Sequence, residues 1–355
     1  MAGTLDLKST ALKVMRSQHD CLRRVARPSR MTRKLGSVQE RGWSSFMAGE
    51  LIIDAYAHAY RPAASGRQIA ERFVCPQRWE EGLDELRAMM RDTDIWRAII
   101  ATVMPAQAMR EEALSQLPSD LSPEAHRKAA TEVCDRILQH MDDYNAWGCE
   151  VGRTHPELLP FINLDPLMMD AVMTRQKVRE AVRQGARGIV LLPALHGFYG
   201  NDRRVWPIYE MAQSFQLPIL TQTGDAGQLP PGGRGHWGRP RYFGDVAVSF
   251  PKLRLILAHL GKGYESEIAV LTRRYPNVFT ETSMRLTGLN EAGKWTPAEA
   301  VTWCRLIGID RILLGTKWPL FDSQEDIDTV RKLPLTSEEK RKILGENAKR
   351  VLQLS

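Results

Sequence analysis

Eight short apolar segments recur along this chain from residue 51 onward, and longer amphipathic segments separate them. Several of the eight are apolar throughout, which is typical of parallel strands that are buried on both faces. Most of them end in Gly, Pro or a polar residue. The segments are LIIDAYAH (51–58), IIATVMP (99–105), LLPFINLDP (158–166), GIVLLP (188–193), PILTQTG (218–224), LRLILAHLG (253–261), NVFTETS (277–283) and RILLGTKWP (311–319).

The segments between these strands have helical patterns. Val178, Ala181 and Val182 recur at helical spacing, and Asp202 is a good N-cap residue. The stretch between the second and third strands, about residues 106 to 157, is long enough to hold an inserted helical element. Helices are expected over 173–186, 202–217 and 336–354.

Eight strands that alternate with helices predict an α/β fold, a (β/α)8 TIM barrel with a helical insertion after strand 2. The alternative is a doubly wound open sheet. Against it, no strand is followed by the glycine-rich GxGxxG loop or by a P-loop. In a barrel the chemistry lies at the carboxyl ends of the strands, so the residues at those ends are the ones to examine.

Polar residues stand at most of the predicted strand ends. Taken singly, each has a structural explanation, such as a hydrogen-bonded histidine or a tyrosine that caps the barrel. Lys317 is harder to explain in that way, because burial of an ammonium without a partner is costly. Their convergence on one barrel mouth predicts a pocket. The residues are Tyr56, His58, Asn163, Asp165, Gln222, Thr223, His259, Glu281, Ser283 and Lys317.

Seven sequence blocks, in their order and spacing, resemble the amidohydrolase superfamily, in its branch of amidohydrolase-related decarboxylases and hydrolases. The resemblance covers residues 51 to 354. It implies a divalent metal held by two histidines of strand 1, a histidine of strand 5 and an aspartate of strand 8, with a strand 6 histidine as a further ligand or catalytic group. The blocks are IDAYAH, GARGIVLLP, VWPIYEMAQSFQLPILTQTG, RPRYFGDVAVSFPKLRLILAHLG, YPNVFTETS, DRILLGTKWP and ILGENAKRVL.

Three of the implied metal ligands are replaced in this chain. Tyr56 stands at the first histidine, Gln222 at the strand 5 histidine and Lys317 at the aspartate, while His58 and His259 match. A catalytic zinc needs about three protein ligands, and an ammonium cannot coordinate a cation. We therefore expect no metal and no other cofactor.

Two further positions bear on the same site. Val190 occupies the place where two-metal members carry a bridging lysine. Lys317 suggests a replacement for the metal, because its charge can stabilise a carboxylate or an oxyanion in a dry pocket. A lysine whose pKa is lowered by burial can also serve as a nucleophile. Asp54, Tyr56, Gln222 and His259 are expected as its hydrogen-bonding partners, and the alternative is a salt bridge that only fills a dead site.

The Gly/Pro-rich segment 224–243 follows strand 5 and is expected to lie over the mouth as a lid. From it His236, Trp237 and Arg239 could contact an aromatic or carboxylate substrate, as could Arg285 after strand 7. The alternative is a surface loop whose arginines face water.

The net charge of +7 comes from the amino-terminal end. Residues 1–41 hold ten Lys/Arg and three Asp/Glu, so the other residues hold 39 of each (49 less 10, and 42 less 3). We therefore expect a basic, disordered arm over 1–46, a barrel domain over 47–355, and no nucleic-acid partner.

The apolar runs and the cysteines bear on the expected cellular location. No apolar run reaches about 18 residues, so no membrane partner is expected. The cysteines form no CxxC pair and are odd in number, which favours a reducing, cytoplasmic location. They are Cys21, Cys75, Cys134, Cys149 and Cys304.

The sequence thus predicts a metal-independent enzyme that acts on a small carboxylated or aromatic molecule, as a decarboxylase or as a lactone or ester hydrolase. His259 or His58 would be the general acid/base, with Lys317 and Tyr56 as electrostatic stabilisers. A rival is a catalytically inactive partner of an active homologue, and a third reading is a metalloenzyme with an unusual ligand set. We expect a homo-oligomer, or a hetero-oligomer with an active homologue.

Deletion of residues 1–45 should leave thermal stability unchanged, because the arm lacks an apolar face that could join a core. The measurement compares melting curves of the full-length and truncated proteins. A loss of many degrees would show that the arm docks on the barrel or on a second subunit.

Overall fold

The computed structural model describes residues 50–59, 82–224, 235–291 and 293–355. The basic arm and half of the glycine-rich lid segment, two of the sequence predictions, lie outside these residues. The remaining predictions concern the barrel and its helices, which the described residues cover.

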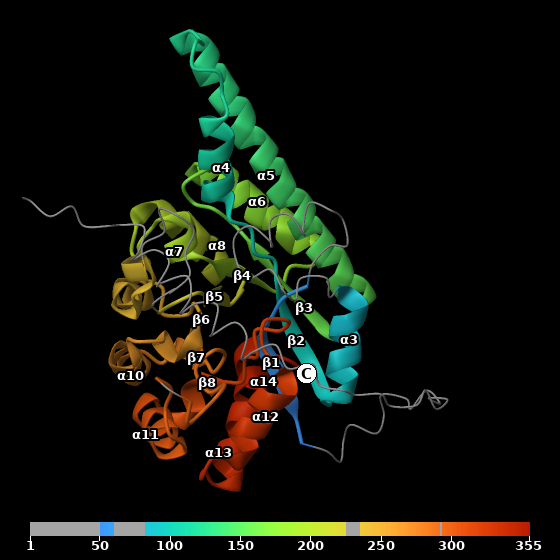
Figure 1. The fold of residues 1–355 in the computed structure, drawn as a ribbon, viewed down its shortest axis with the longest axis vertical. Helices are drawn as coiled ribbons and strands as arrows, with labels where there is room; N and C mark the ends of the chain where they lie inside the picture. Colours follow the sequence, from blue (N-terminus) through green and yellow to red (C-terminus); the bar gives the residue numbers. More distant parts are fainter. Residues whose placement is uncertain (1–49, 60–81, 225–234, 292) are drawn as a thin grey trace, which may run out of the picture. The chain divides into compact units, whose positions relative to one another are not determined.

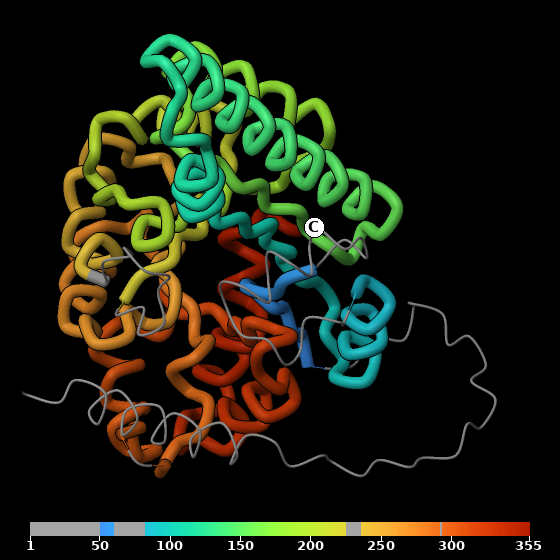
Figure 2. Tube along the Cα trace, turned by 45° about the horizontal axis from the view of Figure 1, so that its top comes forward, coloured from blue at the N-terminus to red at the C-terminus, as the bar shows by residue number. Residues whose placement is uncertain are grey.

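Eight parallel strands pair in sequence order from β1 to β8, which confirms the predicted (β/α)8 barrel (Figure 1). The ring closes where the backbone N–H of Ala55 in β1 donates to the carbonyl of Leu314, just after β8, at 2.8 Å. In Figure 2 the blue segment that holds β1 lies beside red segments from the carboxyl-terminal part of the chain. The strands are β1 (Ile52–Ala57), β2 (Ile95–Ala101), β3 (Leu158–Asn163), β4 (Gly188–Leu191), β5 (Ile219–Thr221), β6 (Leu255–Leu257), β7 (Val278–Glu281) and β8 (Ile312–Leu313).

Burial on both faces explains why the strand sequences are apolar throughout. Alternate residues such as Ile53 and Val190 fill the barrel interior, where they form one hydrophobic cluster. Their neighbours, such as Ile52 and Ile189, pack outward against the helices in a second cluster. Strand β2 begins at Ile95, earlier than the sequence predicts.

The outer layer consists of helices between the strands, and the helices expected from the sequence are present. Asp202 caps a 3-10 turn by accepting a hydrogen bond from the N–H of Arg204 at 2.9 Å. Thr336 and Glu339 form the reciprocal capping box that begins the last helical segment. The elements are α3 (Leu83–Asp92), α6 (Ala171–Gln184), α7 (Pro193–His196), α8 (Trp206–Ser214), α9 (Gly244–Ser249), α10 (Glu265–Arg274), α11 (Pro297–Ile307), α12 (Ser323–Lys332), α13 (Ser337–Arg341) and α14 (Asn347–Leu352).

The predicted helical insertion after strand 2 consists of α4 (Ala106–Ser115) and the 32-residue helix α5 (Pro123–Thr154). The two helices lie side by side and extend beyond the barrel (Figure 1). A small hydrophobic cluster, with Val133 and Ile137 of α5 against Met104, joins them to the end of β2. The insertion is therefore packed onto the barrel and has its own small core.

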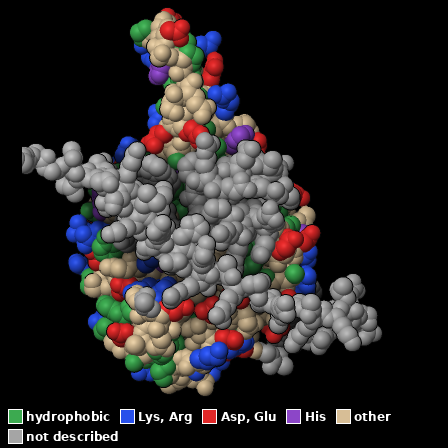
Figure 3. Space-filling view, viewed as in Figure 1, with side chains coloured by type: hydrophobic (Ala, Val, Ile, Leu, Met, Phe, Trp, Pro, Cys, Tyr) green, Lys and Arg blue, Asp and Glu red, His purple; other side chains and the backbone are tan. Residues whose placement is uncertain are grey.

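The described surface is of mixed charge. Acidic and basic side chains are interspersed over the face in Figure 3. Within the described parts of the chain, no helix is long and apolar enough to cross a membrane.

A buried polar network fastens α5 to the barrel. The Asn145 side chain accepts hydrogen bonds from the Thr102 hydroxyl (2.8 Å) and the Asn163 N–H (2.9 Å), and it donates to the Asn163 carbonyl (2.8 Å). Asn145→Ala should lower the free energy of unfolding by roughly 2 kcal/mol, because buried polar groups would lose their partners. Gln139→Ala, on the exposed face of the same helix, should change it by less than about 0.5 kcal/mol. Equal effects in denaturant titrations would contradict a role for this network.

Candidate active site

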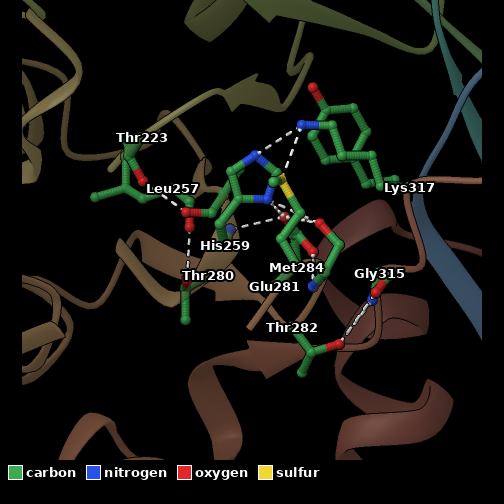
Figure 4. Close-up of polar contacts among 12 residues, drawn as sticks. Thr223, Leu257, His259, Thr280, Glu281, Thr282, Met284, Gly315 and Lys317 are labelled. Carbon is green, nitrogen blue, oxygen red and sulfur yellow. Dashed lines mark hydrogen bonds and ion pairs between the residues drawn. The ribbon is translucent and has the colours of Figure 1, made fainter. Parts of the chain in front are cut away.

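Three ionisable side chains converge at the carboxyl ends of β6, β7 and β8 (Figure 4). His259 begins the 3-10 turn η5 (His259–Gly261) that follows β6, and Glu281 is the last residue of β7. Lys317 lies in the loop after β8. All three are buried, so their charges interact through a medium of low polarity.

The ammonium of Lys317 has uncharged neighbours. Its Nζ lies 3.4 Å from His259 Nε2, 3.1 Å from Met284 Sδ and 5.6 Å from the centre of the Tyr56 ring. Among the residues that the structure describes, no carboxylate oxygen lies within ion-pairing distance of this Nζ. The side chain is also only 6% exposed, which is unusual for a cation without an adjacent anion.

His259 links the lysine to a carboxylate. Its Nδ1 lies 2.8 Å from Ser283 Oγ and 3.2 Å from Glu281 Oε1, and its backbone N–H donates to the same carboxylate at 2.8 Å. The Ser283 hydroxyl also donates to Glu281, at 2.9 Å. These acceptors hold the proton on Nδ1, so the Nε2 lone pair faces Lys317.

Gly315 makes room for this carboxylate. A Cβ atom at position 315 would lie 2.1 Å from Glu281 Oε2, so any other residue would displace the acid. The Ser283 N–H donates to the same oxygen at 2.6 Å. Glu281 therefore has a fixed position behind the imidazole.

The pKa values of the three groups follow from burial and from their mutual contacts. Burial and the charge of Lys317 lower the pKa of His259 to about 4. Burial lowers the pKa of Lys317 to about 8, although Glu281 opposes this shift. Burial acts to raise the pKa of Glu281, but hydrogen bonds from His259 and Ser283 outweigh it and hold that pKa below its usual value. At neutral pH the imidazole is thus neutral between an ammonium and a carboxylate.

Backbone strain is concentrated at this end of the barrel. Of the nine described non-glycine residues with positive φ, five lie within five residues of the ends of β6, β7 or β8, and that conformation costs free energy in L-residues. Strained backbone persists where the surrounding structure enforces it, most often at functional sites. The five are His259 (63°), Leu260 (49°), Lys262 (21°), Met284 (63°) and Lys317 (56°).

Tyr56 of strand β1 and His58, just after this strand, complete the cluster. The Tyr56 ring stacks on His259 with a centroid distance of 5.6 Å, and its edge contacts His58 at 5.1 Å. His58 Nδ1 lies 3.2 Å from the carbonyl of Ala101, and burial together with Lys317 lowers the pKa of His58 to about 3. The structure therefore brings together all four predicted catalytic residues, and both histidines are neutral.

Asp54 does not pair with Lys317, contrary to the sequence expectation. Its carboxylate accepts hydrogen bonds from the backbone N–H groups of Tyr56 (2.9 Å) and Thr316 (3.0 Å) and from the Thr316 hydroxyl (2.6 Å). Burial raises the pKa of Asp54 to about 6. It braces the backbone on either side of the site, while Lys317 N–H donates to the Tyr56 carbonyl at 2.6 Å.

Gln222 of strand 5 and His236 of the lid, two of the predicted substrate contacts, contact other residues of the barrel and the lid. Gln222 is half-buried at the end of β5, and its backbone N–H donates to the Leu191 carbonyl at 3.0 Å. His236 is exposed, and its ring lies 5.8 Å from that of Trp237 and 5.9 Å from that of Tyr199.

The two predicted rim arginines are each neutralised by helix α10. Arg239 forms an ion pair with Glu267, and its guanidinium lies 4.7 Å from the centre of the Tyr264 ring. Arg285 forms an ion pair with Glu265 at 2.6 Å and lies 3.7 Å from the centre of the Trp295 ring. Neither arginine therefore has a spare charge for a substrate, unless its pair opens.

The sequence marks Glu281 and Ser283 as residues at a strand end and predicts no role for them. The available signal was a carboxylate within the apolar strand VFTE, since a buried acid requires a partner. Met284 carried no such signal, because a methionine next to a strand ordinarily only packs.

The residues present do not fit the family's metal. Within the described ranges, no group of three or more His, Cys, Asp or Glu side chains is placed to hold a metal ion. The Nε2 lone pair of His259, which a metal would need, instead faces the ammonium of Lys317. Absence of metal from the working protein stays a prediction.

Comparisons with known proteins agree with the fold. Residues 53–354 match the sequence profile of a family described as amidohydrolase. Among curated proteins, none matches this sequence.

Three solved structures illustrate the structural likeness. An uncharacterised TIM-barrel protein from Bordetella bronchiseptica is 19% identical with a TM-score of 0.60, over 85% of this chain and 98% of that one. The 5-carboxyvanillate decarboxylase of Sphingomonas paucimobilis is 12% identical with a TM-score of 0.60, over 86% and 100%. A dihydroxybenzoic acid decarboxylase from Polaromonas sp. JS666, with bound manganese and 2-nitroresorcinol, is 17% identical with a TM-score of 0.60, over 86% and 98%.

Lys317→Met should raise the free energy of unfolding at neutral pH. A pKa lowered from 10.5 to about 8 means that the charged form costs roughly 3 kcal/mol in the folded state. This net cost already includes the attraction to Glu281, so removal of the charge should gain up to about 3 kcal/mol. Between pH 8 and pH 10.5 the unfolded chain binds more protons than the folded one. As the pH rises through this range, wild-type stability therefore increases and the advantage of the methionine variant shrinks.

Denaturant titrations at several pH values measure this difference. Lys252→Met, at an exposed position, is the control and should change stability by less than about 0.5 kcal/mol at each pH. A Lys317→Met protein that loses several kcal/mol would instead mark the lysine as a structural cation.

Proposed function

The chain belongs to the amidohydrolase family, and we propose that its barrel mouth is a metal-independent active site that decarboxylates a small carboxylic acid. The observation that carries this proposal is the position of the Lys317 ammonium. It is buried at the carboxyl end of the barrel, 3.4 Å from His259 Nε2, and has no adjacent carboxylate among the described residues. A site of this kind supplies a positive charge that a substrate carboxylate can meet.

The names of the structural neighbours favour a lyase over a hydrolase. The enzymes from Sphingomonas paucimobilis and Polaromonas are decarboxylases of small aromatic acids. Their low identity to this chain supports the fold, so their chemistry is carried over here as a proposal. The Tyr56 and His58 rings provide an aromatic wall of the kind that such substrates can stack against.

Lys317 would act at two points of the reaction. Its ammonium attracts the substrate and stabilises the negative charge that develops as the bond to the carboxyl carbon breaks. Carbon dioxide leaves, and the electron pair that stays on the substrate takes a proton. Lys317 can supply this proton and recover one from water through His259 Nε2, with His58 as an alternative acid/base.

A lactone or ester hydrolase is the second candidate, because both histidines are neutral and a neutral imidazole is the form that activates water. In that case Lys317 would stabilise the oxyanion.

Gln222, His236 and Trp237 are proposed as substrate contacts in either reaction, and Arg239 and Arg285 as residues that fix the rim. The strained backbone disfavours the rival reading of a catalytically inactive partner.

Release of carbon dioxide from a panel of small aromatic and aliphatic carboxylic acids tests the proposal. The wild-type protein, treated with a chelator and assayed for metal, should retain its activity. Lys317→Met should lower turnover by about 100-fold or more, as loss of one main charge stabiliser does. Lys252→Met should retain wild-type turnover.

Two results would contradict the proposal. One is turnover that depends on added divalent metal, with one equivalent bound near His58 and His259. The other is hydrolysis of esters or lactones by a protein that releases no carbon dioxide from any acid of the panel, which would favour the second candidate.

A further inference from the structure

We propose that Lys317 acts as a covalent nucleophile, and that the substrate is a small 3-oxo carboxylic acid whose ketone forms a Schiff base with this lysine before carbon dioxide is lost. The inference rests on the proposed decarboxylase function and specifies its substrate class. It goes beyond an electrostatic role, because the amine must lose a proton and form a bond.

The surroundings of the amine accommodate its neutral form. A buried lysine that serves as a cation ordinarily has a carboxylate against it. Among the residues that the structure describes, the two polar atoms within reach of Nζ are an imidazole nitrogen and a thioether sulfur, both uncharged and both acceptors. Glu281 lies on the far side of the His259 ring and pairs with that ring instead. Loss of the ammonium proton therefore leaves no adjacent anion without its partner.

His259 is placed to take that proton. Its Nε2 lone pair faces Nζ at 3.4 Å, while Nδ1 is held by Ser283 and Glu281. A proton accepted on Nε2 makes an imidazolium that the carboxylate of Glu281 stabilises at once. Lys317, His259 and Glu281 thus form a chain of contacts from nucleophile to base to orienting acid. Chains of this kind activate side-chain nucleophiles in other enzymes.

The walls of the site suit an iminium ion. The centre of the Tyr56 ring lies 5.6 Å from Nζ, a distance at which an aromatic face attracts a cation. Met284 provides a second polarisable contact. The left-handed backbone of Lys317 (φ 56°) and the hydrogen bond from its N–H to Tyr56 O fix where the side chain begins.

The reaction balances with water alone. The amine attacks the ketone carbon, the carbonyl oxygen takes a proton, and the resulting hydroxyl leaves as water with a proton from His259, which gives the iminium. The bond between the carboxyl carbon and the adjacent carbon then breaks, its electron pair moves toward the iminium nitrogen, and carbon dioxide leaves an enamine. The enamine carbon takes a proton, and water hydrolyses the iminium to the product ketone and the free amine.

This chemistry selects the substrate class. The iminium accepts the electron pair only when the carboxylate is on the carbon next to the original ketone. A 3-oxo acid meets this condition, whereas a 2-oxo acid or a simple aliphatic acid does not.

Reductive trapping with acetoacetate and cyanoborohydride tests the inference on the full-length protein. We expect one N-isopropyl group per chain, which peptide mapping places on Lys317 and which abolishes turnover. Lys252→Arg should show the same adduct, because its change is far from the site and only removes an exposed lysine. Lys317→Arg keeps the positive charge and should give no adduct, and His259→Asn should slow adduct formation at least tenfold.

The outcomes separate this inference from the proposed function. Lys317-dependent release of carbon dioxide without any adduct on Lys317 would overturn the Schiff base and leave the electrostatic mechanism. An adduct on Lys317 that still carries the carboxyl group would support the nucleophile and overturn the decarboxylase. Should the variants fail to fold, the position of the adduct in wild-type protein decides alone.

Discussion

The contact between Lys317 Nζ and His259 Nε2, at 3.4 Å, is the interaction on which the rest of the site depends. A buried ammonium is costly, and here its charge is balanced at a distance, by Glu281 through the imidazole ring. Three adjacent strands deliver these groups, and Asp54 braces the backbone on the other side of the lysine. The barrel thus holds the unfavourable buried charge in an ordered series of contacts from ammonium to imidazole to carboxylate.

In the proposed mechanism a fixed ammonium takes the place of the metal as the cationic centre. A divalent metal carries more charge and can activate water, but it needs several ligands that Tyr56, Gln222 and Lys317 do not supply. An ammonium carries one charge, requires no ligand set and can exchange its proton. Chemistry that needs an electron sink or a proton donor therefore suits this site better than chemistry that needs a metal-bound hydroxide.

The sequence predicts the barrel well because burial on both faces leaves a direct mark on each strand, as Ile52 and Ile53 show by packing outward and inward. It also locates Lys317, His259, Tyr56 and His58 at one mouth, because strand ends in a barrel meet there. Partner choice could not be predicted. Asp54 lies within β1 and Glu281 ends β7, and both carboxylates accept backbone hydrogen bonds. Only the positions of Thr316 and of the turn at His259 decide that Asp54 binds the Thr316 hydroxyl, whereas Glu281 faces the imidazole.

The pKa of Lys317 is the quantity that tests this account most directly. Competitive labelling of the amine across a pH series, read out by peptide mass, measures it in wild-type protein and in Glu281→Gln. The account predicts a value of about 8 in the wild type, and a lower value in the variant because Glu281 favours the charged form. A pKa of Lys317 at the ordinary 10.5 in the wild type, or a pKa that is the same in the wild type and in Glu281→Gln, would contradict the coupling of these residues.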